Sequence, residues 1–343
     1  MQIRPHTWGI SVTRGIFLHV ARRSHRRFIL RVPTEVGCAT LTSARCLIVT
    51  ADDFGLSIPV NEAVERAHCE GVLSAASLMI GAPAAEDAVE RARSLPSLGV
   101  GLHLTLIDGR PVLPPDKIPG LVGPDGRFFS NPFRIGLALY VSSELRRQAE
   151  AEIKAQFERF LRTGLRLDHV NAHRHFHLHP VVLQSVMGIA ARVDRPPVRI
   201  PLEPFIPSFR ASRSRLFGRL LSSAFYFAQT RRMRRNLREA GIPSNDHLFG
   251  LNDSGALTEP LLLGLLDHLP DGVSEIYCHP ATRNWEGTDN LPSCYRPESE
   301  FAALLSPAVK KAMEKRRLWP LSYRGAFNGV HKAASERVTK GSL

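Results

Sequence analysis

Cysteine is scarce in this sequence. The 343 residues include five cysteines, and no two of them stand in a CxxC pair. This spacing excludes a disulfide framework and a zinc site built from thiolates. Free thiols are typical of a reducing compartment, so we expect a cytoplasmic protein.

Long apolar runs are also missing. The arginine-rich start of the chain contains only the short run GIFLHV, residues 15–20, which is shorter than the apolar region of a signal peptide. No segment approaches the roughly 18–20 apolar residues that a membrane-spanning helix needs. The chain also lacks a GxSxG nucleophile motif, which argues against a serine hydrolase of that type.

Acidic residues are nearly absent from two stretches. Of the net charge of +13, residues 1–45 contribute +7 and residues 210–238 contribute +9, so the rest of the chain carries −3. Because the chain outside these two stretches is slightly acidic, we do not expect a nucleic-acid partner. We predict an irregular basic extension over 1–44, which could serve as a targeting or membrane-contact arm, one folded domain over 45–327 and a tail over 328–343.

Apolar periodicity predicts alternating strands and helices in the body of the chain. The strands are expected over 46–55, 74–83, 99–106, 165–173, 197–201 and 274–280, and the helices over 57–71, 84–95, 142–164, 181–193, 258–269 and 298–315. Residues 108–133 are expected to form a loop. The alternation indicates an α/β protein with parallel strands, and its length favours a single divergent (β/α) barrel of the TIM-barrel type.

Four of the predicted strand ends carry residues that can bind a metal or move protons. They are the pair Asp52 and Asp53, then His103, His173 and His279. In a parallel sheet these ends share one edge, where two imidazoles and one carboxylate can form an open three-ligand metal site. The second carboxylate could then act as a general base on water. Each residue alone also fits a helix cap, a core histidine or a turn, but their joint placement favours a site.

The stretch HVNAHRHFHLHP, residues 169–180, has histidine at alternate positions. On a straight strand these side chains would share a face but stand ~6.6 Å apart, too far for neighbours to bind one ion. We therefore expect the strand to end near His173, which becomes the ligand candidate. His175 and His177 are expected to contact the substrate or the ligands, and His179 to be structural.

Several separated blocks resemble one protein family. TADDFG, GLHL, HVNAHRHFH and EIYCHPA are similar to the YdjC-like carbohydrate deacetylases over about residues 46–325. NEAVERAH, ASLMIGAPAA, GLHLTLIDGRPVLPP and GLNDSGALTE look closer to the branch of hopanoid-biosynthesis-associated deacetylases. The resemblance implies a divergent β/α barrel that uses a divalent cation to remove acetyl from an N-acetylated amino sugar, here an N-acetylglucosaminyl hopanoid.

The resemblance also implies a role for each residue of the strand ends. Asp52 resembles the catalytic base of the family, and Asp53, His103 and His173 resemble its metal ligands. His279 stands where related deacetylases place the histidine that protonates the leaving amine.

The sequence also gives expectations for Asn171, for Arg199 and for the identity of the metal. Many family members have aspartate where this chain has Asn171, which bears on how a ligand histidine is held. We expect Asn171 and Arg199 to contact the ligands or the substrate. The resemblance implies Mg²⁺, whereas histidine ligands also suit Zn²⁺ and other transition metals.

The segment 210–238 has one apolar stripe bracketed by arginines. The stripe consists of residues 216, 217, 220, 221, 224, 225 and 228. It fits a helix packed on its own domain, or a basic amphipathic helix on an anionic membrane. In the second case Arg231, Arg232, Arg234 and Arg235 would contact lipid, which suits a lipid-linked substrate and a peripheral location at the inner face of the cell membrane. A homodimer is a further expected assembly.

Other functions stay open at this point. The same residues could serve a deacetylase of soluble chito-oligosaccharides or of another N-acetylated sugar. They could also serve a metal-dependent barrel phosphoesterase or isomerase, because His/Asp edges support many reactions. A basic membrane- or RNA-binding protein with idle edge residues is the non-enzymatic alternative.

Overall fold

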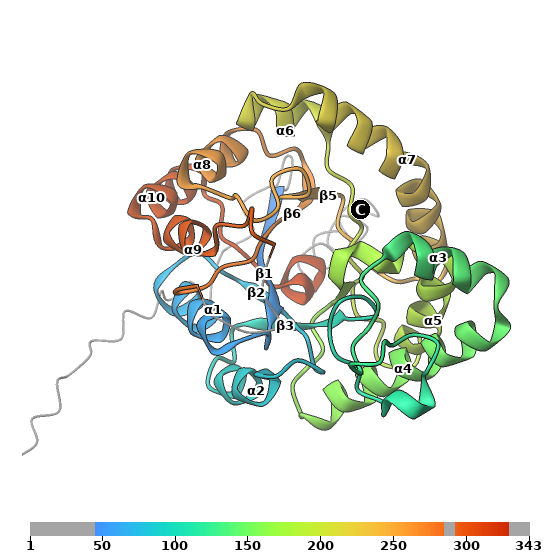
Figure 1. Cartoon of the computed structure of the whole chain (residues 1–343). Helices are drawn as coiled ribbons and strands as arrows, with labels where there is room; N and C mark the ends of the chain where they lie inside the picture. Colours follow the sequence, from blue (N-terminus) through green and yellow to red (C-terminus); the bar gives the residue numbers. More distant parts are fainter. Residues whose placement is uncertain (1–44, 285–291, 329–343) are drawn as a thin grey trace, which may run out of the picture. The chain divides into compact units, whose positions relative to one another are not determined.

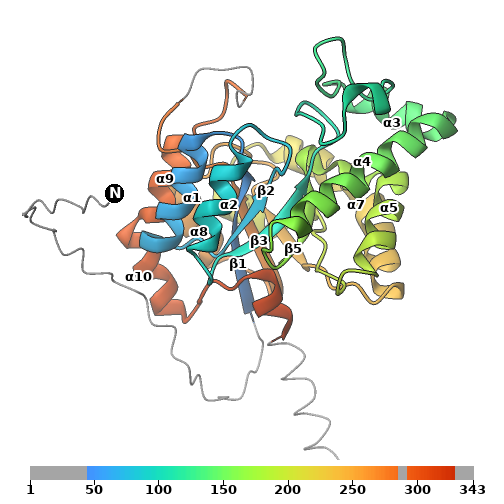
Figure 2. The ribbon, with the colours of Figure 1, turned by 90° about the horizontal axis from the view of Figure 1, so that it is seen from below.

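A computed structural model describes residues 45–284 and 292–328 of the chain. Within these residues, six parallel strands form one sheet in the order β4-β3-β2-β1-β6-β5. Helices surround the sheet on its outer side (Figures 1 and 2). The predicted extension over 1–44 and the tail from 329 lie outside the described residues.

Strands and helices alternate along the chain. The strands are β1 (Arg45–Phe54), β2 (Ala75–Leu78), β3 (Gly99–Leu104), β4 (Val170–Ala172), β5 (His247–Phe249) and β6 (Gly272–Cys278). The helices are α1 (Ile58–Glu70), α2 (Ala85–Arg93), α3 (Pro132–Val141), α4 (Ser143–Arg162), α5 (Pro180–Ala190), α6 (Phe205–Ser212), α7 (Leu216–Glu239), α8 (Glu259–Asp267), α9 (Pro297–Leu305) and α10 (Pro307–Arg316), with short 3-10 segments η1 (Pro115–Lys117) and η2 (His173–Leu178). Because all strand pairs are parallel, their carboxyl ends share one edge of the sheet.

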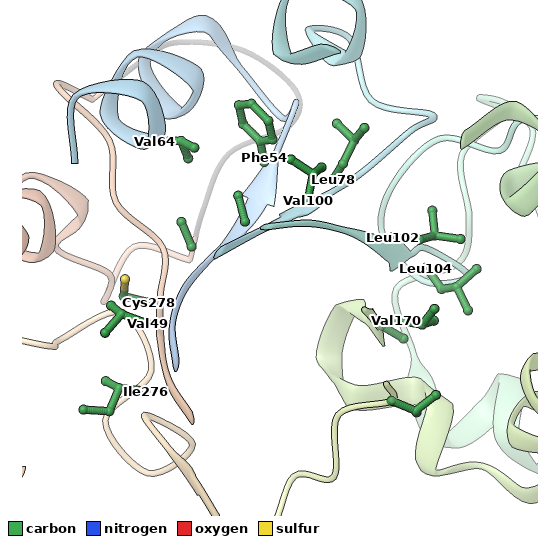
Figure 3. Packing of buried hydrophobic residues seen from close by; sticks show 14 of the residues in the cluster. Val49, Phe54, Val64, Leu78, Val100, Leu102, Leu104, Val170, Ile276 and Cys278 are labelled. Carbon is green, nitrogen blue, oxygen red and sulfur yellow. The ribbon is translucent and has the colours of Figure 1, made fainter. Parts of the chain in front are cut away.

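The two faces of the sheet have different side chains. In β1, Leu47, Val49 and Ala51 belong to the large apolar core beneath the helices. Figure 3 shows this outer layer, with labelled residues of β1, β2, β3, β4 and β6 and with Val64 of α1. The alternate residues of β1 face the inner side, where Ile48 near the amino end is followed by Thr50 and Asp52. The inner face thus becomes polar toward the carboxyl edge.

Helical residues 323–328 fill the amino end of the inner face. Tyr323 and Ala326 pack there against one residue each from β1, β2 and β6. The backbone N–H groups of Tyr323 and Arg324 donate to the carboxylate of Asp168, each at 3.0 Å. This arrangement holds the C-terminal helix under the sheet, on the side opposite the carboxyl ends.

The sheet does not close into the predicted barrel. Residues 197–201 form only an isolated parallel bridge, between Val198 and Val170. Beyond it, Val198 N donates to Pro243 O and Leu248 N donates to Leu202 O, each at 2.9 Å. Between these two bonds the Asn245 side chain accepts from Ile200 N (2.7 Å) and donates to Ile200 O (3.0 Å), so a side chain interrupts the backbone pairing. The prolines at both ends of this segment have no N–H to donate. The α/β class and the parallel strands are confirmed, but the closed barrel is wrong, and the sheet is a half-barrel.

Three helix boundaries also differ from the prediction. The helix expected over 298–315 is divided, because Ser306 caps α10 through its side chain and Pro307 follows. The segment 210–238 is divided between α6 and α7, since Arg213 and Arg215 adopt left-handed conformations between them. α3 begins in the last two residues of the predicted loop and continues to Val141 through residues for which no element was predicted, and the short strand β5 was not predicted either.

The apolar stripe of α7 does not face the domain. The inward side of this helix carries Arg219, Thr230, Met233 and Leu237, which are buried. The residues of the predicted stripe are exposed instead. No helix in the described parts of the chain has both the length and the apolar composition to cross a membrane.

Candidate metal centre

The acidic pair at the end of β1 has an unusual backbone. Neighbouring residues of a regular strand point to opposite faces. Here the pairing of β1 with β2 becomes irregular between Ala51 and Phe54, and Asp53 adopts a left-handed conformation with φ of 61°. Such an irregularity re-aims side chains at functional edges. It allows both carboxylates to face the same site.

The three predicted ligands come together. Asp53 Oδ1 lies 3.3 Å from His103 Nε2 and 3.2 Å from His173 Nδ1. One donor atom from each of the three residues lies within 4.8 Å of the other two. These residues come from β1, β3 and the start of η2, and Asp53 and His103 are buried. One carboxylate and two imidazoles fit a divalent cation that keeps open positions, so these residues would hold it.

Asn171 orients one of these ligands. Its Oδ1 lies 2.7 Å from His103 Nδ1, so the imidazole donates from Nδ1 and leaves the lone pair of Nε2 toward Asp53 and the metal position. The Asn171 amide nitrogen donates to Ser77 Oγ (2.8 Å) and to Asp52 Oδ1 (3.3 Å). The amide thus links the ligand histidine to the second carboxylate.

Asp52 lies beside the three ligands and pairs with a buried arginine. Arg199 Nη1 donates to Asp52 Oδ2 at 2.5 Å and Nη2 donates to Oδ1 at 3.0 Å. The same guanidinium donates to both oxygens of Glu275, whose Oε2 also accepts from the Tyr323 hydroxyl. All of these side chains are buried. Arg199 therefore fixes the orientation of the Asp52 carboxylate.

The charges of the site set its protonation states. Burial alone would raise the pKa of Asp52, but Arg199 and His103 outweigh it and hold that pKa well below its usual value. Burial would likewise raise the pKa of Asp53, which the two ligand histidines hold well below normal. Burial acts to lower the pKa of His103, yet the neighbouring carboxylates raise it. Both acids are therefore ionised at neutral pH.

The histidine-rich stretch leaves the strand where the sequence predicts. β4 ends at Ala172, and His173 begins η2, which has a kink at Arg174 and His175 with positive φ. Burial and the nearby Arg199 charge lower the pKa of His175 well below normal, and burial lowers that of His177 to about 4. Both imidazoles are therefore neutral at pH 7.

Each of the last three histidines has its own contact. His177 Nε2 donates to the backbone oxygen of Arg199 at 2.8 Å, and His175 Nε2 lies 3.2 Å from the Tyr277 hydroxyl. His179 Nε2 donates to Gly136 O at 3.1 Å, in α3. His175 and His177 thus pack behind the metal position, and His179 ties α3 to the turn.

His279 directly follows β6 at the same edge. Cys278 pairs with Ala51 of β1, so His279 and Asp52 follow neighbouring positions of the two strands. The His279 ring lies 4.9 Å from that of Tyr295, and its Nδ1 has no hydrogen-bond partner among the described residues. The backbone N–H of His279 donates to Glu300 Oε2 at 2.6 Å. The backbone of His279 is thus held by α9, and its ring by Tyr295.

Sequence reasoning missed several supporting residues. Glu275 stands in the middle of an otherwise apolar strand, and this mismatch with the strand pattern could have pointed to a buried charge partner. Asp108 lies after β3 with φ of 65°, 3.8 Å from His173 Nε2 and 2.7 Å from Arg174 Nε. Ser77 and the tyrosines around His279 carried no signal in the sequence.

The predicted membrane residues have different surroundings. Arg231, Arg232 and Arg235 are exposed on α7. Arg234 lies half-buried and pairs with Asp246 at 3.1 Å, so it belongs to the inner side of the helix.

Comparison with known proteins identifies relatives of this chain. The family model described as YdjC-like protein matches residues 46–315. A carbohydrate deacetylase of Geobacillus stearothermophilus is 32% identical over 281 residues, which cover 82% of this chain and 97% of that protein. A carbohydrate deacetylase of Vibrio vulnificus is 37% identical over 280 residues, covering 81% and 94% of the two chains.

A solved structure shares the fold. It is a protein of Enterococcus faecalis that is provisionally described as a cellobiose-phosphate cleavage protein. The TM-score is 0.62 at 27% sequence identity, and the match covers 82% of this chain and 98% of that one.

Proposed function

This chain belongs to the YdjC-like protein family, and from this membership we propose that it is a carbohydrate deacetylase, a hydrolase of N-acetyl amide bonds. The observation that carries the proposal is the convergence of Asp53, His103 and His173 with the ionised Asp52 beside them. The names of the relatives favour this activity over a phosphoesterase or an isomerase.

We propose that the reaction depends on a divalent metal held by Asp53, His103 and His173. When bound, the cation would polarise the acetyl carbonyl and lower the pKa of water, as divalent metals do in hydrolases. The family resemblance favours Mg²⁺, and the two imidazoles favour Zn²⁺ or another transition metal.

Asp52 is suited to accept the proton of the attacking water. A carboxylate offers about four lone-pair positions. Arg199 and Asn171 occupy two on Oδ1, and Arg199 occupies one on Oδ2, so Oδ2 keeps a position for the proton. Its pairing with Arg199 keeps Asp52 ionised and fixed in direction.

His279 is suited to protonate the leaving nitrogen. An amine is a poor leaving group unless it receives a proton as the C–N bond breaks. The Nδ1 atom of His279 is buried and Tyr295 packs against the ring, so Nε2 would be the atom that reaches the amide. The acid, His279, would thus approach the amide from the end of β6, and the base, Asp52, from the end of β1.

We propose that the substrate is the N-acetylglucosaminyl head group of a hopanoid. The support is the likeness of separated sequence blocks, such as GLHLTLIDGRPVLPP and GLNDSGALTE, to the hopanoid-associated branch. A lipid-linked substrate suits a cytoplasmic protein held peripherally at the inner face of the cell membrane. The alternative is a soluble chito-oligosaccharide, which the relatives' description as carbohydrate deacetylases also accommodates.

The activity is tested by acetate release from both kinds of substrate. The metal-loaded protein should remove one acetyl group, with a matching loss of mass, and EDTA should abolish the reaction. In Asp52→Asn we expect turnover to fall by about 10²–10⁴, the usual contribution of a general base, with metal content unchanged. Full turnover in this variant would contradict the assigned base, and activity on diacetylchitobiose alone would contradict the hopanoid.

A further inference from the structure

Two helices expose apolar faces to solvent. In α3, Phe133 is 78% exposed, and Leu137, Tyr140 and Val141 share its side of the helix at spacings of four, seven and eight residues. In the first half of α7, Phe217 is 78% exposed, with further apolar residues beside it. The exposed large apolar residues of this half are Leu216, Phe217, Leu220, Leu221, Phe225 and Phe227.

Both faces lie at the edge of the sheet that holds the metal centre. α3 lies in the long connection between β3, the strand that carries His103, and α4. This connection leaves the carboxyl end of β3, and α3 stands out from the body in Figure 2. The start of α7 is tied to the loop after β5, because Arg219 pairs with both carboxylate oxygens of Asp253 at 2.6 and 2.7 Å. Arg215 also donates to Asn252 O in that loop, at 3.2 Å.

The outward side of α7 changes character along its length. Phe217, Leu221 and Phe225 on this side are preceded by the exposed Arg210 and Arg213, near the loop after β5. The later arginines of α7 lie toward the opposite edge of the sheet, where Arg234 pairs with Asp246 just before β5 and Arg235 with Glu239. The segment 210–238 contains nine arginines and no acid. Apolar side chains next to arginines are typical of helices that rest on anionic lipid, where the apolar part enters the acyl boundary and the arginines meet head groups.

A second copy of the chain fits this surface poorly. In a twofold contact the same patch faces itself, so two surfaces that both carry net positive charge would come together. Like charges brought together in this way oppose association. The basic residues 1–44 of the same chain would be repelled for the same reason.

We propose that the molecule docks on an anionic lipid surface with its catalytic edge, through the apolar faces of α3 and the first half of α7 and through the exposed Arg210 and Arg213 that precede α7. We call this set of residues the docking surface. The inference deepens the proposed function, because it turns the metal centre toward the membrane in which a lipid-linked sugar would lie. It is independent of which sugar is deacetylated.

Vesicle sedimentation of the full-length protein tests the docking surface. Binding is compared on neutral phosphatidylcholine vesicles and on vesicles containing phosphatidylglycerol, at low and high salt. The parent protein should bind the anionic vesicles preferentially, and salt should weaken this binding. Because each basic residue near an anionic surface adds about fivefold to binding, Arg210→Gln with Arg213→Gln should reduce it about twenty-five-fold.

Paired apolar substitutions test the two helices separately. Phe217→Ser with Leu221→Ser, and Phe133→Ser with Leu137→Ser, should each weaken binding at least tenfold. The control is Leu161→Ser, an exposed leucine in the last turn of α4, at the opposite edge of the sheet, and it should bind like the parent. Every variant keeps residues 1–44, so any contribution of that extension is common to all.

Three results would overturn the proposal: no binding to anionic vesicles, equal binding by parent and variants, or a dimer that the apolar substitutions convert to monomer. Acetate release from a soluble acetylated sugar, measured without vesicles, should be the same in parent and variants. This second assay separates the two proposals, because a failure of deacetylation leaves the vesicle result unchanged.

Discussion

At the scale of single residues, the centre depends on how its buried charges are compensated. Arg199 is fully buried between Asp52 and Glu275, and its guanidinium donates to both carboxylates. Removing one partner of a buried ion pair typically costs 3–5 kcal/mol, because the remaining charge loses its compensation. The low pKa of Asp52 is a consequence of this pairing. A proton acceptor is thus held ionised and in one orientation.

Asn171 should control metal affinity through His103. Asn171→Ala removes the acceptor of the His103 Nδ1 proton, and we expect metal affinity to fall about 10–100-fold, the usual effect of losing such a partner. Asn171→Asp keeps an acceptor oxygen, so it should bind the metal at least as tightly as the parent. Chelator competition measures both. Equal affinity in Asn171→Ala and the parent would show that His103 needs no such support.

His177 should make the protein less stable in mild acid. Its pKa is lowered from an ordinary 6.5 to about 4, so between these pH values the unfolded chain binds a proton that the folded protein excludes. The free energy of unfolding therefore decreases as pH falls from 6.5 toward 4, by up to about 3 kcal/mol from this residue.

The variant His177→Gln isolates this contribution. Glutamine can still donate to the backbone oxygen of Arg199 but does not titrate. Urea unfolding at several pH values should show a shallower loss of stability for the variant between pH 6.5 and 4. Parallel curves for the two proteins would exclude His177 as the cause.

At the scale of elements, close packing explains the glycine in the middle of β3. A Cβ on Gly101 would lie 2.5 Å from the His169 ring, which is held between Asp168 (3.1 Å) and Ser77 (2.9 Å). The ring cannot easily move, and Ser77 in turn contacts Asn171. The next inward residue of β3 is His103, so the packing at Gly101 supports the ligand strand.

Gly101→Ala should therefore destabilise the fold by about 1–3 kcal/mol, the usual cost of overpacking a core. Gly188→Ala is the matched control, because a Cβ at this helical, exposed position meets nothing within 4 Å. It should be neutral or stabilise by up to about 1 kcal/mol. Denaturant unfolding compares the two. A neutral Gly101→Ala would mean that His169 shifts without cost.

At the scale of the whole molecule, the metal position joins distant parts of the half-barrel. Its three residues come from β1, β3 and η2, which span four of the six strands from the centre of the sheet to its β4 edge. A cation that binds only the folded protein would stabilise the entire domain by mass action. Metal affinity and folding are therefore coupled.

Metal should raise the melting temperature. At a free metal concentration of one hundred times Kd, the folded state gains about 2.7 kcal/mol, which corresponds to a rise of about 5 °C or more. EDTA should reverse the rise, and Asp53→Asn should abolish it. Differential scanning calorimetry with Zn²⁺ and with Mg²⁺ measures the effect. An equal rise in Asp53→Asn would place the binding elsewhere.

The sequence by itself determined the local features of this protein. Apolar periodicity located most of its helices and strands, and the extended spacing of the histidines predicted that β4 ends before His173. The ligand candidates Asp53, His103 and His173 followed from their positions at strand ends, because parallel strands bring those ends to one edge. Local patterns of this kind can be read directly from the amino-acid sequence.

Tertiary structure alone decided the remaining features. The side chain of Asn245 interrupts the pairing that would close the sheet, because it bonds to the backbone of Ile200, 45 positions earlier in the chain. The partners of Arg199 lie 147 and 76 residues away, and the outward direction of the α7 stripe depended on which side of the helix the domain buries. Long-range contacts leave no periodic signal in the sequence, so only the folded arrangement shows them.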